Sequence, residues 1–157
     1  MKEIRTQIEI AAPASTVWQT LTSFKAYPEW NPFITEIQGD IQEGAKLSVL
    51  ITPPGRKAME FTPRVMRVIP MQEFRWLGRV FLPGIFDGEH IFEIEPIDND
   101  RSRLVHREKF KGLLVPFILK SIGTATHKGF ELMNKGIKKR AEATYNQGNV
   151  SNLDSGA

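Results

Sequence analysis

Apolar and polar residues alternate along much of the chain up to residue 110, as they do in β-strands that bury one face. Turn segments containing proline and glycine divide the alternating stretch into separate runs. These runs cover residues 2–10, 33–41, 46–52, 57–69, 73–81 and, on either side of a turn, 86–110. We therefore predict seven strands in a sequential antiparallel meander. Pro63, inside the fourth run, indicates a sheet edge or a bulge because proline has no N–H to donate.

Helical periodicity replaces the alternation at two places. Residues 11–21, with Pro13 and Ser15 near their start, predict a short helix, and a shorter helical turn follows within 24–30. After Pro116, apolar residues recur at helical spacing, which predicts a helix of about 28 residues, roughly 42 Å long. The apolar face of this helix needs a partner, and the inner face of a curved antiparallel sheet is available. The predicted fold class is α+β.

Length and composition predict one soluble domain, which we place at residues 1–145. The chain has 157 residues, no cysteine and a formal net charge of +3. Without cysteine it can form neither a disulfide framework nor a cysteine metal site, which suits a cytoplasmic protein. Its longest apolar run is too short to span a bilayer, so we expect no transmembrane segment. Its basic cluster, 135–140, lacks the interleaved aromatics of a nucleic-acid site. We expect the polar segment 146–157 to be disordered.

Three segments carry a family-specific pattern: "IEIAAPASTVWQTLTSFKAYPEWNPFI" near the start, "FRWLGRVFLPGIFDGEHIFEI", and "RLVHREKF" before the long helix. Together with the order of elements, they resemble the START-like (SRPBCC) superfamily of helix-grip proteins, which includes plant pathogenesis-related allergens, polyketide cyclase/dehydratase-like proteins and lipid-transfer domains. The resemblance covers about residues 3–145. It implies a curved seven-stranded sheet, two short helices after the first strand, and a long C-terminal helix over an apolar cavity. It implies no catalytic residue, because the superfamily shares no catalytic motif.

Two histidines and a glutamate fall on the aromatic face of the last two predicted strands. Alternate side chains of a strand share a face, so His90 is in phase with the phenylalanines of its strand, and His106 and Glu108 are in phase with Phe110. Three-residue loops at 82–84 and 98–100 keep this face common to neighbouring strands. The cross-strand pairs predicted from these loops are Phe92–His106, His90–Glu108, Trp76–His90 and Phe74–Phe92.

The polar group formed by Trp76, His90, His106 and Glu108 has three interpretations. It could orient the carbonyl or hydroxyl group of a ligand. A histidine could instead act as general acid or base, with the carboxylate selecting its tautomer. In the third interpretation His90 and Glu108 only satisfy each other, as buried polar groups normally do. A metal site of two histidines and one carboxylate would lack a fourth ligand and a recognised motif, so we predict no metal and no cofactor.

The expected function is the binding of a small hydrophobic molecule, such as a lipid, an aromatic or a polyketide-like compound, between the long helix and the sheet. One alternative is a cyclase/dehydratase-type enzyme that uses a pocket histidine, and another is a chaperone-co-activator-like interaction module. The sequence assigns no catalytic residue and leaves the oligomeric state open. The predicted ligand-binding residues are Phe33, Phe61, Phe74, Trp76, Phe86, His90, Phe92, His106, Glu108, Phe110, Phe130 and Met133.

Overall fold

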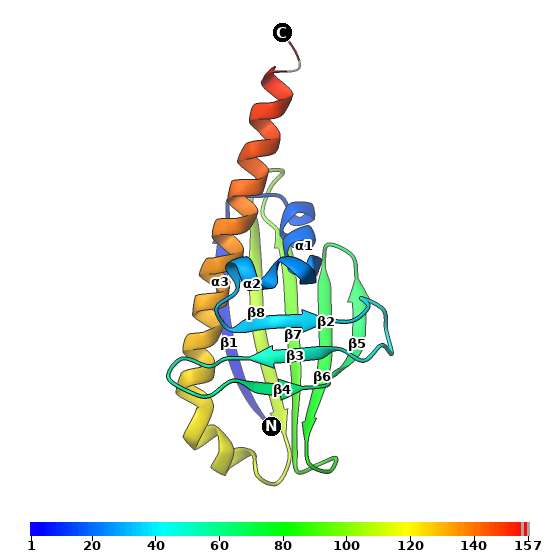
Figure 1. Ribbon diagram of the computed structural model, residues 1–157, viewed down its shortest axis with the longest axis vertical. Coiled ribbons are helices and arrows are strands. Elements are labelled where there is room, and N and C mark those ends of the chain that lie inside the picture. The colour runs from blue at the N-terminus through cyan, green and yellow to red at the C-terminus, as the bar shows by residue number, and fades with distance from the viewer. Residues whose placement is uncertain (155, 157) are drawn as a thin grey trace.

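The computed structural model of the protein describes residues 1–154 and 156. It confirms the α+β class, with antiparallel strands gripped by one long helix (Figure 1). The order of elements along the chain is β1 (Lys2–Ile10), α1 (Ala14–Thr22), η1 (Phe24–Ala26), α2 (Tyr27–Trp30), β2 (Ile34–Gln38), β3 (Ser48–Ile51), β4 (Met59–Phe61), β5 (Arg64–Ile69), β6 (Glu73–Val80), β7 (Phe86–Pro96), β8 (Ser102–Lys111) and α3 (Val115–Asp154).

The described strands number eight instead of the predicted seven, because the run 57–69 is divided into β4 and β5. Pro63 lies at the division, where its missing N–H interrupts the ladder. The strands form a five-stranded sheet in the order β1-β8-β7-β6-β5 and a three-stranded sheet in the order β2-β3-β4. Figure 1 shows the smaller sheet crossing the larger one. Backbone hydrogen bonds from Leu47 to Pro63 and from Val65 to Ala45 connect the two sheets.

Helix α3 packs against β1 and β8, and Met133 and Ile137 of the predicted apolar stripe are fully buried. Glycine at position 129 admits the ring of Phe33, since a Cβ there would lie 2.2 Å from a ring carbon. The helix is 40 residues long, and it includes residues 146–154 of the segment that we expected to be disordered. That segment contains no proline, so the helix can propagate without a new nucleation step. Residues 155 and 157 lie outside the described part of the chain. No helix among the described residues has the length and apolar character needed to cross a membrane.

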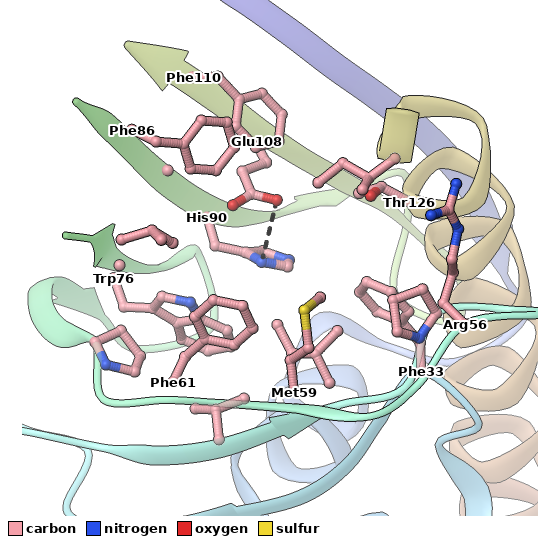
Figure 2. A pocket seen from close by; sticks show the side chains of 18 of the residues that line it. Phe33, Arg56, Met59, Phe61, Trp76, Phe86, His90, Glu108, Phe110 and Thr126 are labelled. Atoms are coloured by element: carbon pink, nitrogen blue, oxygen red, sulfur yellow. Dashed lines mark ion pairs between the residues drawn. The ribbon is translucent and has the colours of Figure 1, made fainter. Parts of the chain in front are cut away.

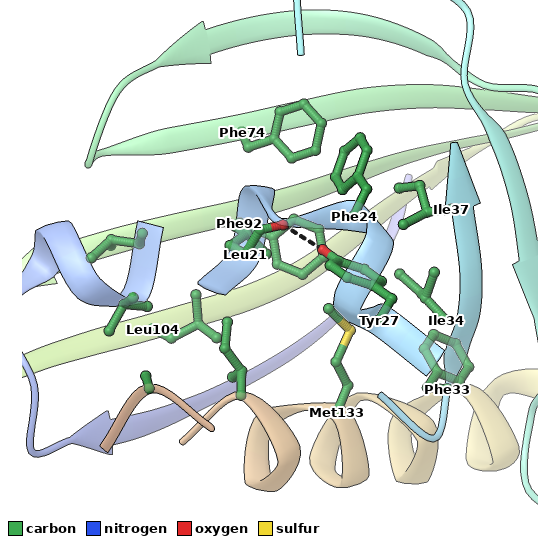
Figure 3. Packing of buried hydrophobic residues seen from close by; sticks show 14 of the residues in the cluster. Leu21, Phe24, Tyr27, Phe33, Ile34, Ile37, Phe74, Phe92, Leu104 and Met133 are labelled. Carbon is green, nitrogen blue, oxygen red and sulfur yellow. Dashed lines mark hydrogen bonds between the residues drawn. The ribbon is translucent and has the colours of Figure 1, made fainter. Parts of the chain in front are cut away.

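The short helices close one end of the main core. Leu21, Phe24 and Tyr27 are buried there against Phe74 and Phe92 of the larger sheet (Figure 3). The Tyr27 hydroxyl donates to the Leu21 carbonyl over 2.6 Å, which satisfies its polar end inside this core. A second, smaller apolar cluster lies near the start of α3 and contains Phe86, Phe110 and Val115. The two clusters are the packed regions on either side of the candidate site.

Candidate functional site

The registers of β6, β7 and β8 are those predicted from the loop lengths. Phe92 faces His106 and His90 faces Glu108 across β7 and β8, while Trp76 faces His90 and Phe74 faces Phe92 across β6 and β7. A slip of one residue would turn the aromatic row outward, so burial of this face holds the register. The sheet therefore brings both histidines and the glutamate together on its inner face.

A cavity of about 380 Å³ lies between the two sheets and α3 (Figure 2). Gly78 and Gly88 are directly opposite each other in β6 and β7, so two adjacent positions of the inner face carry no side chain. The Glu108 carboxyl occupies the space over Gly88, where a Cβ would lie 2.4 Å from Glu108 Oε1, and the space over Gly78 remains open. A Cβ on Gly78 would have no neighbour closer than 3.8 Å. The residues that line the cavity are Phe33, Val49, Ile51, Pro53, Arg56, Lys57, Met59, Phe61, Pro63, Trp76, Gly78, Val80, Phe86, Gly88, His90, Glu108, Phe110, Ile122 and Thr126.

A chain of hydrogen bonds runs from the cavity wall into α3. The Nε2 atoms of His90 and His106 are 2.6 Å apart, and His106 Nδ1 lies 3.0 Å from Asn134 Oδ1. Asn134 Nδ2 donates to Thr6 Oγ1 over 2.8 Å, and the Thr6 hydroxyl donates to the His106 carbonyl over 3.2 Å. Thr6 and Asn134 also border a second, polar cleft between β1 and α3. These hydrogen-bonded side chains thus connect the apolar cavity with the polar cleft between β1 and α3.

The hydrogen bonds select one tautomer for each histidine. The proton of Thr6 Oγ1 is used by the His106 carbonyl, so this oxygen accepts from Asn134 Nδ2 and leaves Asn134 Oδ1 as an acceptor. His106 must then donate from Nδ1, and its bare Nε2 accepts the Nε2–H of His90. Neutral His90 is left with a bare Nδ1, which lies 4.0 Å from Glu108 Oε2. The cavity wall therefore presents an imidazole acceptor next to a carboxyl group.

Comparison with known proteins identifies the family. The chain matches, over residues 1–142, the family described as polyketide cyclase / dehydrase and lipid transport. The chain belongs to this family. No curated protein matches the sequence.

Solved structures support the same helix-grip fold. The Zhui aromatase/cyclase from Streptomyces sp. R1128 is 15% identical with a TM-score of 0.74, over 90% of this chain and 93% of that one. A START superfamily protein from Mycobacterium smegmatis is 21% identical with a TM-score of 0.69, over 90% and 98% of the two chains. A norcoclaurine synthase from Thalictrum flavum is 17% identical with a TM-score of 0.66, over 88% and 84%. At these identities the likeness concerns the fold alone, and it agrees with the helix-grip fold expected from the sequence. The family match over residues 1–142 confirms the resemblance to the START-like superfamily.

In this family member the residues predicted to bind ligand divide into two groups. The first group lines the cavity and consists of Phe33, Phe61, Trp76, Phe86, His90, Glu108 and Phe110. The second group is buried outside the cavity wall and consists of Phe74, Phe92, His106, Phe130 and Met133. Phe130 stacks on the His106 ring with centroids 3.9 Å apart, so packed side chains fill the region that the second group occupies.

Several lining residues were missed by the sequence reasoning. Gly78 and Gly88 carry a usable signal, because they are in phase with Trp76 and His90 on the inner face. Asn134 binds His106 and does not line the cavity, and it also carries a signal, because it follows Phe130 by four residues and so shares its helix face. The segment 53–56 in the β3–β4 connection could line the pocket entrance, but its sequence favours an ordinary turn; in the structure Pro53 and Arg56 do line the cavity. Their position depends on how the smaller sheet folds over the larger one.

Burial shifts the pKa of His90, His106 and Glu108 in the direction that favours the neutral form of each group. Desolvation lowers the pKa of His106 to about 3, although its hydrogen bond with Asn134 acts in the opposite direction. Desolvation, with repulsion from His106, lowers the pKa of His90 well below its usual value. Burial raises the pKa of Glu108 to about 8, although 19% of its side chain remains exposed. Near neutral pH, both imidazoles are therefore neutral, and the Glu108 carboxyl on the cavity wall is mostly protonated.

The same geometry leaves no space for a metal ion between the histidines. Two nitrogens bound to one tetrahedral metal ion at about 2 Å would lie roughly 3.3 Å apart, whereas the Nε2 atoms of His90 and His106 are only 2.6 Å apart. The described residues contain no cluster of three or more candidate metal ligands. The pair is therefore a hydrogen-bonded unit.

Proposed function

We propose that the protein binds a small, largely apolar molecule in the cavity between the sheets and α3. The observation that carries this proposal is a mostly apolar cavity whose wall holds His90 and Glu108 as a polar pair. Its volume of about 380 Å³ lies within the range of ordinary small-molecule sites, about 300–1,000 Å³. A few polar groups among apolar walls are typical of such sites, since burial supplies affinity and the polar groups orient the ligand.

The polar pair favours a ligand that carries a hydroxyl group. Protonated Glu108 can donate a hydrogen bond, and the bare Nδ1 of His90 can accept one. The distance of 4.0 Å between these groups is too long for a direct hydrogen bond. A ligand hydroxyl could accept from the first and donate to the second. Phe61 and Trp76 add aromatic surface to the wall, and the similar norcoclaurine synthase was solved with dopamine and hydroxybenzaldehyde, which are aromatic compounds with hydroxyl groups.

The enzymatic alternative needs an acid or base that can reach the ligand. His106 does not line the cavity, and His90 offers only Nδ1, because its Nε2 is engaged with His106. Glu108 is the other group in reach, and a carboxyl with a pKa of about 8 is suited to act as a general acid near neutral pH. If a substrate is identified, Glu108→Gln should therefore lower turnover more than binding. If Glu108→Gln lowered turnover and binding equally, Glu108 would have no role beyond ligand binding, and the enzymatic alternative would lose its acid.

Mass spectrometry of the intact, gently purified protein tests the proposal. We expect a co-purified small molecule, or else saturable binding of the apolar fluorophore phenylnaphthylamine. Gly78→Leu places a side chain in the cavity and should abolish both signals. Gly148→Leu is the matched control, because a Cβ at Gly148 meets no atom within 4 Å and the residue lies far along α3. Absence of any bound molecule, or equal binding by wild type and Gly78→Leu, would contradict the proposal.

A further inference from the structure

Two loops at one end of the molecule form an exposed apolar surface, which we call the apolar tip and define as residues 81–85 and 112–117. The loops are the β6–β7 and β8–α3 connections, which lie together at the lower end of the molecule in Figure 1. Backbone hydrogen bonds from Leu113 to Gly84 and from Leu114 to Ile85 hold them side by side. The large exposed side chains of the tip are Phe81 (80% exposed), Leu82 (71%), Leu113 (75%) and Phe117 (75%).

The backbone of the tip contains an unusual conformation at its most exposed aromatic residue. Phe81 has a φ of 66°, in the left-handed region that bulky residues rarely adopt. A glycine would satisfy this turn without steric strain, yet the position carries a phenylalanine that is 80% exposed. Neither folding nor core packing accounts for such a residue. Strained and exposed residues of this kind are candidates for a role in binding.

The charges around the tip are mainly positive. The segments 79–86 and 110–129 contain no aspartate or glutamate. Exposed Lys2, Lys111 and Lys120 border the tip, and none of them forms an ion pair within the described chain. The nearest acid in the sequence, Asp87, accepts a hydrogen bond from the Gly84 N–H and lies 3.6 Å from Arg79. An apolar surface with a basic border is complementary to a surface that is apolar inside and negatively charged outside.

We propose that the apolar tip docks on the surface of an anionic lipid bilayer. In this arrangement the exposed aromatic and leucine side chains enter the interfacial region, and the bordering lysines contact lipid phosphates. The cavity lies close behind, since Phe86 and Phe110 belong both to its wall and to the smaller core cluster under the tip. Arg56, at the exposed side of the cavity, contacts the Ser121 carbonyl, one helical turn from Phe117. Docking would therefore bring the cavity near the membrane, but it does not require the cavity to be occupied.

Flotation with vesicles tests this docking. The probes are vesicles of phosphatidylcholine alone and of phosphatidylcholine with an equal amount of phosphatidylglycerol, at low and high salt. We expect binding to the anionic vesicles, weakened by salt because the lysine contacts are screened. Phe81→Gly and Phe117→Ser should each weaken binding about tenfold, by removing one large apolar side chain from the interface. Leu153→Ser is the matched control, because Leu153 is 77% exposed near the other end of α3 and should not affect binding.

Folding and self-association are measured alongside. Phe81→Gly relieves a left-handed φ and Phe117 is largely exposed, so both variants should unfold at temperatures close to that of the wild type. The cavity-filling Gly78→Leu should still bind vesicles, which separates a failure of docking from a failure of the proposed function. The docking proposal is wrong if the wild type does not bind anionic vesicles, or if the tip variants bind as well as Leu153→Ser. It is also wrong if sedimentation shows a wild-type dimer that Phe81→Gly and Phe117→Ser dissociate, because the tip would then be covered by a second copy of the chain.

Discussion

Replacing Glu108 with glutamine tests the electrostatics of the cavity wall. The raised pKa of about 8 means that the folded protein holds the Glu108 proton more tightly than the unfolded chain does, in which the value is 4.5. For a group of this kind, the stabilising contribution is fully present below pH 4.5 and is lost as the pH rises through about 8. Wild type should therefore lose stability relative to Glu108→Gln across this interval. Glutamine has nearly the same shape and no proton to lose.

The clearest interval for measurement lies between about pH 6.5 and about pH 9. Buried His90 and His106 have pKa values below the ordinary histidine value of 6.5. Their contribution to the free energy of unfolding is therefore fully present above pH 6.5 and is lost only as the pH falls below that value. Integration of the Glu108 titration alone over the alkaline interval gives a loss of about 2 kcal/mol. Access of water to the partly exposed carboxyl would make the loss smaller.

Urea unfolding at several pH values would measure this loss. The difference in free energy of unfolding between wild type and Glu108→Gln should change by about 2 kcal/mol from the acidic to the alkaline end of the interval. Groups elsewhere titrate equally in both proteins and cancel in the difference. A difference that is constant with pH would show that Glu108 titrates normally, and the donor role assigned to it in the cavity would then be wrong.

Two further predictions concern helix α3. Asn134→Leu removes the acceptor for His106 Nδ1–H, so the free energy of unfolding should fall by about 1–3 kcal/mol. Nitrogen NMR of His106 should show that the Nδ1–H tautomer is no longer favoured. An unchanged tautomer would contradict the hydrogen-bond chain. Gly129→Ala drives a Cβ into the Phe33 ring and should destabilise the protein by about 1–3 kcal/mol in thermal or urea unfolding. Gly123→Ala is the matched control, because the nearest neighbour of its Cβ is 4.0 Å away, and it should stabilise the protein by up to about 1 kcal/mol. Equal effects of the two substitutions would mean that Gly129 is not held against Phe33.

Much of the inner face could be predicted from the sequence, because two local properties determine it. Side chains in a strand alternate with a period of two, and the length of a hairpin loop sets which residues face each other. These rules placed His90 opposite Glu108 and Trp76 opposite His90 correctly. Pro63 was predicted to mark a sheet edge or a bulge, and the edge is correct, because β4 and β5 on either side of it are edge strands of the two sheets.

The hollow part of the site could not be predicted in this way. The period of two along each strand shows that Phe74 and Phe86 share a face of the sheet. It does not show that Phe74 packs against Phe24 whereas Phe86 borders a cavity. That difference depends on the volumes that the short helices, the smaller sheet and α3 bring from distant parts of the sequence. The length of α3 was also underestimated, since a polar segment without proline can continue a helix that packing has already started.

The hydrogen-bond chain gives a physical reason for the polarity of the cavity wall. Buried polar side chains are tolerated when each has its partners, and apolar residues of similar size could fill the same space without requiring any. His106 and Asn134 meet that condition inside the protein. At the cavity end, the bare Nδ1 of His90 and the Glu108 carboxyl are too far apart to satisfy each other. A wholly apolar ligand would leave these two groups unpaired, whereas a ligand with one hydroxyl group between them would pair both. The selectivity that we propose for a hydroxylated ligand would therefore depend on the His90 tautomer, which Asn134 sets through His106.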